Sequence, residues 1–189
     1  MRVPGGVLAL LAAACILCTA CGCLDTSSPP QSSGGITPID LPEPEGYTLT
    51  EALAELDILS VEGGLNITGT SMHQVLGNRV TLDGRAAAWA IGLKDGKEVR
   101  WLTSGITGWR ETSLPAPLPD DEVNMTGILS PPEDLLAAQG DVIRPAMERL
   151  DASTVDIVLA EGGVYTINIR SDARMESLAF RADTGEVIV

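Results

Sequence analysis

The spacing of apolar residues predicts a first amphipathic helix just after residue 46. Thr48-Leu49-Thr50-Glu51 reads as a capping box, in which the Thr48 hydroxyl accepts a backbone N–H and Glu51 reaches back to the cap. Apolar residues then recur at helical spacing from Leu49 to Leu59. The pattern therefore predicts a helix with one buried face.

A second helix is predicted to begin at Ser130-Pro131-Pro132-Glu133, where the same capping device recurs and a proline fits the first helical position. Its apolar stripe runs from Leu136 to Leu150. Pro145 lies inside this stripe and removes a backbone hydrogen bond. We therefore expect a kink or a restart near Gly140-Asp141.

Alternating apolar residues separated by glycine-containing turns predict antiparallel strands after each helix. For residues 85–103, a three-residue loop, Lys94-Asp95-Gly96, would pair Trp89 with Trp101 and Ile91 with Val99. A two-residue Asp95-Gly96 turn would mix apolar and charged residues on one face. We therefore expect the three-residue loop.

The requirement that apolar residues share one face of a hairpin also predicts a Glu161-Gly162-Gly163 loop, in which Gly163 alone adopts a positive φ. The expected pairs are Leu159 with Tyr165, Ile157 with Ile167, and Val155 with Ile169. At the end of the sequence, an Asp183-Thr184-Gly185 loop would place Phe180 opposite Ile188.

These elements predict an α+β fold with two tandem units, each a helix packed on an antiparallel β-meander. The first unit spans residues 47–112 and the second spans residues 130–189. A proline-rich connector, residues 113–129, joins them, and the pattern leaves open whether they form one sheet or two domains. Residues 24–46 are rich in Ser, Pro, Gly and Thr, which is typical of a disordered tether.

The second unit closes with the motif Asp183-Thr184-Gly185-Glu186-Val187. In its order of helix and strands and in this closing hairpin, the unit resembles the PepSY family, whereas the first unit matches only in outline. The resemblance implies a PepSY/cystatin-like fold and an extracytoplasmic, non-enzymatic module. Some relatives restrain peptidases. The resemblance brings no catalytic residues.

Residues 1–23 resemble a secretory signal of the lipoprotein type. Arg2 precedes an apolar run from Val7 to Leu17, which is too short to span a bilayer. The pairs Ala20-Cys21 and Gly22-Cys23 both offer a small residue before a cysteine that could carry a lipid. The position three residues before each cysteine is Cys18 or Ala20, where such signals have an aliphatic residue. An ordinary cleaved signal is the alternative, and a zinc site lacks a second ligand cluster.

The composition also favours a place outside the cytoplasm. The net charge of −14 and the small number of lysines, Lys94 and Lys97, disfavour nucleic acid as a partner. An acid-rich, lysine-poor composition is also common in archaeal cell-surface proteins. Asn66 and Asn124 begin glycosylation triplets, so the chain could be a glycoprotein.

No residue set for catalysis, cofactor binding or metal binding is expected. The single histidine, His73, lies near Ser71, but neither a nucleophile elbow nor a phosphate loop accompanies it. The run Asp120-Asp121-Glu122 reads as a solvated connector, with a calcium site as the alternative. Trp109, flanked by glycines, is either a core or edge-strand residue or a ligand platform.

We therefore expect a membrane-anchored, extracytoplasmic binding module without catalytic activity. Its membrane contact would be an N-terminal lipid, and its partner would be a protein or peptide at the cell surface. The alternative is a secreted hydrolase that uses paired carboxylates or a metal.

Overall fold

A computed structural model describes residues 46–125 and 130–188 of the chain. The predicted signal and tether, with Cys21 and Cys23, lie outside the described residues, as do residues 126–129 and Val189. Within the described ranges, no helix is both long and apolar enough to cross a membrane.

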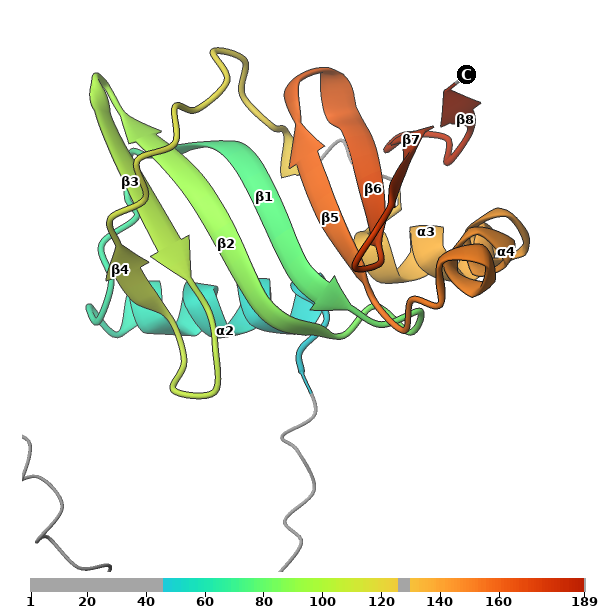
Figure 1. The fold of residues 1–189 in the computed structure, drawn as a ribbon. Helices are drawn as coiled ribbons and strands as arrows, with labels where there is room; N and C mark the ends of the chain where they lie inside the picture. Colours follow the sequence, from blue (N-terminus) through green and yellow to red (C-terminus); the bar gives the residue numbers. More distant parts are fainter. Residues whose placement is uncertain (1–45, 126–129, 189) are drawn as a thin grey trace, which may run out of the picture. The chain divides into compact units, whose positions relative to one another are not determined.

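The described chain builds one antiparallel sheet in the order β4-β3-β2-β1-β5-β6-β7-β8 (Figure 1). The strands are β1 (Ser71–Val80), β2 (Ala86–Asp95), β3 (Glu98–Thr103), β4 (Arg110–Thr112), β5 (Val155–Ala160), β6 (Val164–Arg170), β7 (Met175–Arg181) and β8 (Val187–Ile188). Because β1 pairs with β5, the two meanders share one sheet. The predicted α+β class is confirmed.

Three helices pack on the sheet: α2 (Leu49–Val61), α3 (Pro132–Ala138) and α4 (Gly140–Leu150). The capping box of α2 is present, with the Glu51 N–H 3.2 Å from the Thr48 hydroxyl and the Thr48 N–H 3.0 Å from the Glu51 carboxylate. The expected restart also occurs, since α4 begins at Gly140. The second capping box is wrong, because Pro131 is the N-cap of α3 and no side chain caps it.

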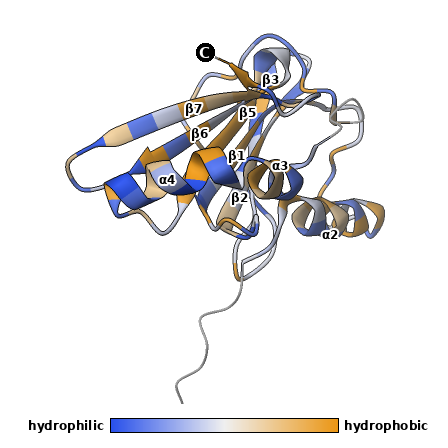
Figure 2. Cartoon of the chain, turned by 90° about the vertical axis from the view of Figure 1, so that its right-hand side faces the viewer, coloured by the Kyte–Doolittle hydropathy of each residue, from blue (hydrophilic) through white to orange (hydrophobic). Residues whose placement is uncertain are grey.

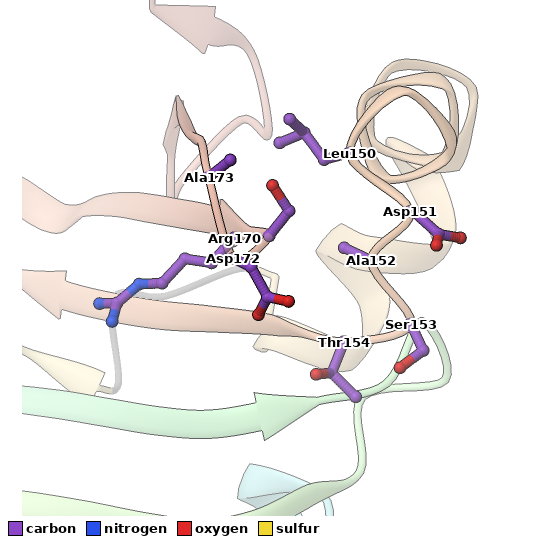
Figure 3. A pocket seen from close by; sticks show the side chains of 9 residues that line it. Leu150, Asp151, Ala152, Ser153, Thr154, Arg170, Asp172 and Ala173 are labelled. Atoms are coloured by element: carbon purple, nitrogen blue, oxygen red, sulfur yellow. The ribbon is translucent and has the colours of Figure 1, made fainter.

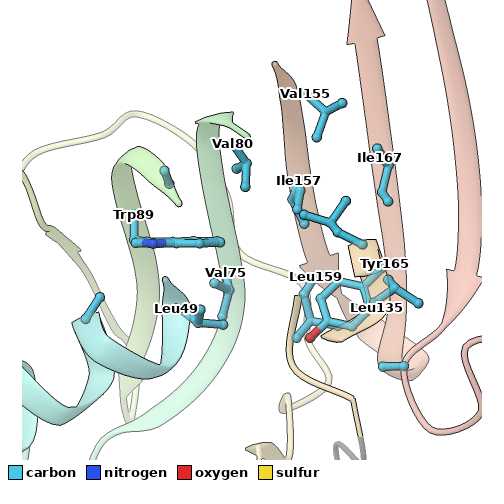
Figure 4. Close-up of a cluster of buried hydrophobic side chains, with 14 of the residues drawn as sticks. Leu49, Val75, Val80, Trp89, Leu135, Val155, Ile157, Leu159, Tyr165 and Ile167 are labelled. Carbon is cyan, nitrogen blue, oxygen red and sulfur yellow. The ribbon is translucent and has the colours of Figure 1, made fainter. Parts of the chain in front are cut away.

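The main core lies between the three helices and one face of the sheet (Figure 4). In Figure 2 each helix shows hydrophobic and hydrophilic residues side by side, as amphipathic helices do. The largest fully buried side chains include Trp89, Tyr165 and Phe180. Each such side chain stabilises the fold by about 1.5–3 kcal/mol through burial. The Trp89 indole also donates to the Tyr47 carbonyl at 2.8 Å, which links the chain before α2 to the sheet.

The predicted β2–β3 register is wrong. Trp101 pairs with Gly92 and Leu102 pairs with Ile91, so the turn contains two residues, Gly96 and Lys97. The prediction assumed that both tryptophans share one sheet face. Trp101 instead lies on the face away from the helices, where its indole donates to the Ala116 carbonyl of the connector.

The β5–β6 register is confirmed in all three predicted pairs. Its loop differs from the prediction in one respect, because Gly162 and Gly163 both have positive φ, at 74° and 64°.

The last hairpin also differs by one residue, since Phe180 pairs with Val187. Ala182 is buried and donates its N–H to the Gly163 carbonyl at 2.7 Å. The Arg181 N–H donates to the Glu186 carbonyl at 2.9 Å, so the turn between them has four residues, 182–185.

Candidate functional site

The described chain enters the fold at one end of the sheet. The Arg85 guanidinium donates to the Gly46 carbonyl at 2.8 Å, and the Ala86 N–H donates to the Tyr47 carbonyl at 2.9 Å. Ala86 begins β2 and pairs with Val80 at the end of β1, which in turn pairs with Val155 at the start of β5. We call this end of the sheet the entry end. It comprises the β1–β2 connection, the α4–β5 loop and the β6–β7 turn.

Two adjoining hollows open at the entry end. One, of about 460 Å³, lies between the α4–β5 loop (residues 150–154) and the β6–β7 turn (residues 170–173) (Figure 3). The other, of about 360 Å³, lies between Leu82 of the β1–β2 connection and Arg144 and Met147 of α4. Both are lined by residues 151–153. The two hollows therefore adjoin at this loop, and we call them together the depression.

The lining of this depression combines hydroxyl groups with charges of both signs. Ser153 and Thr154 lie on the α4–β5 loop, Arg170 ends β6, and Asp172 lies on the β6–β7 turn (Figure 3). Arg170 is partly neutralised by Asp156, at 3.4 Å. Hydroxyl and guanidinium groups can donate hydrogen bonds to the oxygens of an anion, whereas the negatively charged aspartates would repel an anion.

Asp151 ends α4 in a left-handed conformation with φ of 53°. Its N–H bonds to the carbonyls of Met147 and Glu148, which closes the helix in the position where glycine is the usual residue. Its carboxylate also stands at the negative end of the helix dipole, which is unfavourable.

Three arginines of β1, α4 and the β6–β7 turn have no ionic partner in the described part of the chain, and one of them, Arg144, lines the depression together with Glu148. Within residues 46–125 and 130–188, the guanidinium groups of Arg79, Arg144 and Arg174 make no ion pair or hydrogen bond. All three side chains are exposed. Arg79 lies in a bulge at the end of β1 and has a φ of 51°, a conformation that is uncommon for arginine.

The opposite end of the sheet is rich in acids. Asp121, Glu122 and Asp183 line a hollow of about 490 Å³ with Gly162 and Gly163. A hydrogen bond and the charge of Asp121 raise the pKa of the neighbouring Glu161 carboxyl. In the described part of the chain, no group of three or more acidic, histidine or cysteine side chains is arranged to hold a metal ion.

The connector carries its acids on the surface. Asp120, Asp121 and Glu122 are exposed, and Asp120 pairs with Lys94 at 3.3 Å. The connector is also anchored, because the Val123 N–H donates to the Met72 carbonyl at 2.7 Å and Val123 is buried.

His73 and Ser71 are in contact. The Ser71 hydroxyl lies 2.9 Å from the His73 Nε2 atom, at a bulge of β1. The His73 ring is buried, and its Nδ1 atom has no hydrogen-bond partner among the described residues. A catalytic triad would place a carboxylate at Nδ1, so this pair has only two of the three members.

The other predicted site residues are placed as follows. Trp109 is buried, and its indole N–H donates to the Ala52 carbonyl of α2 at 2.8 Å. This placement fits the core role and leaves little exposed ring for a ligand. Asn66 and Asn124 are both exposed. Cys21 and Cys23 lie outside the described residues.

Two further buried polar groups had no signal in the sequence. The Tyr165 hydroxyl and one Glu133 carboxylate oxygen are buried and have no hydrogen-bond partner in the part of the chain that the structure describes. Burial and the nearby charge of Glu133 raise the pKa of Tyr165. Gly84 of the β1–β2 connection packs directly against Glu133, since a Cβ at Gly84 would lie 2.7 Å from the Glu133 Cα. These contacts connect the two halves of the chain.

Comparisons with known proteins do not assign a family. No protein-family model matches the sequence, and no curated protein matches it significantly. Among solved structures, a candidate lipoprotein (CD1622) from Clostridium difficile 630 is similar in fold, with a TM-score of 0.47 and 11% identity. The match covers 78% of this chain and 94% of that protein. At this level the likeness defines neither a family nor a function.

Proposed function

We propose that this chain is a membrane-anchored binding module on the extracytoplasmic side, without catalytic activity. Its anchor is a lipid on Cys21 or Cys23, and residues 24–46 form the tether. The folded body belongs to the PepSY-like type and binds a protein or peptide at the cell surface.

The observation that carries the proposal is the place where the chain enters the fold. Gly46 is held at one end of the sheet by Arg85, next to the start of β2. A tether attached there leaves the opposite end, with the connector and its carboxylates, free to face away from a membrane. An anchored body with one free end is suited to present a binding surface.

The anchor is tested by replacing both candidate cysteines. The Cys21→Ser, Cys23→Ser variant should leave the membrane fraction while keeping its fold, because each buried CH₂ of a lipid contributes about 0.8 kcal/mol of membrane affinity. The matched control is Cys15→Ser, Cys18→Ser, which should stay with the membrane. Protease added to intact cells should remove the folded body of the wild-type chain. Retention of the first variant, or protection from the protease, would contradict the proposal.

A secreted hydrolase with paired carboxylates is the second candidate. The contact between Glu161 and Asp121, which raises the pKa of Glu161, is the observation that favours it. This candidate requires that Asp121→Asn abolish a hydrolytic activity of the purified chain, or that the chain keep a stoichiometric metal after dialysis.

A further inference from the structure

The side of α2 that faces away from the sheet is apolar. The residues that this helix buries are Leu49, Ala52 and Leu56. Ala54, Ile58 and Val61 follow one another at spacings of four and three residues, so they form a second apolar stripe on the opposite side of the helix. We call these three residues the outer stripe. A helix that is apolar on opposite sides is normally covered on both.

The outer stripe is strongly exposed. The exposed fraction is 57% for Ile58 and 83% for Val61, which are neighbours on the helix surface. The β3–β4 loop borders α2, since a Cβ at Gly108 would lie 3.3 Å from the Glu55 Oε1 atom, and this loop carries Ile106, which is 80% exposed. Scattered exposed apolar residues are ordinary, whereas a contiguous group of them marks an interaction site.

Carboxylates surround the outer stripe. Glu55 and Asp57 flank it on α2, and Glu62 is the C-cap of the helix. None of these three carboxylates has an ion pair in the described residues. The helix C-terminus adds the negative end of its dipole, and the last turn holds no basic residue. The surroundings of the stripe therefore favour a positively charged partner.

The arginines of the neighbouring elements do not balance these charges. Arg85 pairs with Glu51 at 3.1 Å, and Arg100 pairs with Glu111 at 2.8 Å. Arg110 lies on the other face of the sheet, because side chains alternate along a strand and the residue before it donates to α2. The three carboxylates around the stripe thus remain without a counter-charge.

These charges also decide what covers the stripe. A second copy of this chain would bring an identical acidic rim against the first one. The tether is acidic too, since it holds no lysine or arginine and carries Asp25, Asp40, Glu43 and Glu45. Like charges brought together across an interface oppose association. A segment that combines an apolar side with cations fits both the stripe and its rim.

We propose that the outer stripe of α2 docks an amphipathic helix of a partner protein, whose lysines or arginines meet the acidic rim. This inference rests on the proposed function, because it names the class of partner that the surface module binds. Anchors spaced like Ala54, Ile58 and Val61 are those by which two helices pack side by side, and the small Ala54 side chain allows a close approach. The 13 residues of α2 offer the partner a length of roughly 20 Å, at about 1.5 Å per residue.

The test measures binding of synthetic helical peptides to the Cys21→Ser, Cys23→Ser chain by isothermal titration calorimetry. The basic probe has leucine at the a and d positions of successive heptads, with lysine and alanine elsewhere. The acidic probe has glutamate in place of each lysine. The test variant of the stripe is Ile58→Gln, Val61→Gln. Its control removes as many exposed apolar side chains from other parts of the surface through Val99→Thr, Met175→Gln.

A second pair of variants tests the acidic rim. The rim variant is Glu55→Gln, Asp57→Asn, Glu62→Gln. Its control removes the same charge from exposed carboxylates elsewhere through Glu98→Gln, Glu122→Gln, Glu186→Gln. Each exposed ion pair strengthens binding roughly twofold, so the rim variant should bind the basic probe about fivefold to tenfold more weakly. High salt should reduce this difference.

The basic probe should bind and the acidic probe should not. The stripe variant should weaken binding of the basic probe by roughly tenfold or more, because it removes two large apolar anchors, while the controls should change it by less than about twofold. Circular dichroism checks that all variants are folded. No binding of the basic probe, equal binding of both probes, or an equal loss in variant and control overturns the inference.

Two other outcomes would assign the stripe to a different occupant and would also overturn the inference. One is self-association of the parent chain in sedimentation that the stripe variant removes, which would indicate a second copy. The other is tighter binding of the basic probe after Ile36→Ser, Ile39→Ser, Leu41→Ser, which would indicate the tether. None of these results bears on the cysteine anchor, because that anchor is read from membrane fractionation.

Discussion

Gly77 is the position where one added methyl group should disturb the centre of the sheet most directly. It lies on β1 between Trp89 of β2 and Ile157 of β5, at the junction of the two meanders. A Cβ at this position would lie 2.5 Å from the Trp89 Cζ3 atom and 2.8 Å from the Val80 Cγ2 atom. Because the φ of Gly77 is not positive, Gly77→Ala tests contact rather than backbone conformation.

Gly77→Ala should lower the free energy of unfolding because the Trp89 ring has little room to move. The ring is fully buried, and its N–H donates to the Tyr47 carbonyl at 2.8 Å, so it cannot move without weakening that bond. Overpacking costs about 1–3 kcal/mol, and a weakened hydrogen bond costs about 0.5–1.5 kcal/mol. Alanine regains about 0.5–1 kcal/mol by restricting the unfolded chain. We expect Gly77→Ala to lower the free energy of unfolding by about 2 kcal/mol.

Urea unfolding of the Cys21→Ser, Cys23→Ser chain measures this change. The control is Gly105→Ala, because a Cβ there meets no atom within 4 Å and the φ is not positive. A smaller ring should relieve the contact, so Gly77→Ala should cost less in a Trp89→Phe background, with a coupling of about 1 kcal/mol. Equal midpoints for Gly77→Ala and the parent chain, or strictly additive effects, would refute the packing described here.

Three further predictions concern loops and charges. Gly162→Ala and Gly163→Ala should each lower the free energy of unfolding by about 1 kcal/mol, because both positions have positive φ; an unchanged urea midpoint for either would contradict that geometry. Asp151→Gly should raise the free energy of unfolding by about 1 kcal/mol, since it removes both the left-handed strain and a negative charge at a helix C-terminus, and a lower melting temperature would argue against this. The raised pKa of Glu161 means that its contribution to stability is present at acidic pH and is lost as the pH rises through that pKa. Glu161→Gln should therefore raise the melting temperature at pH near 7 but not at pH near 4, and the same shift at both values would exclude repulsion by Asp121 as the cause.

Local sequence patterns predicted those parts of the fold that depend on local contacts. The capping box at Thr48 and Glu51 forms because its partners are three residues apart. The register of β5 and β6 follows from alternation, since Leu159 and Tyr165 both face the helices. The restart of the helix at Gly140 was also predicted from a local feature, because Pro145 removes a backbone hydrogen bond one turn earlier.

Long-range contacts explain the errors. Trp101 faces away from the helices because the connector covers that side of the sheet, where Leu118 packs close to Gly92 and Trp101. The alternation pattern of β3 does not show which face a distant segment will cover. The hollows beside the α4–β5 loop were missed for a similar reason, since Leu82 and residues 151–153 come together only through the pairing of β1 with β5 and the packing of α4.

The central claim, that a lipid on Cys21 or Cys23 holds the chain at the membrane, is tested most directly by the intact mass of the chain extracted from membranes. One spectrum reports both the first residue and any attached lipid. The account predicts a chain that begins at Cys21 or Cys23 and is heavier than its amino-acid mass by a lipid group. A mature chain that begins elsewhere, or one whose mass equals that of its residues alone, would contradict it.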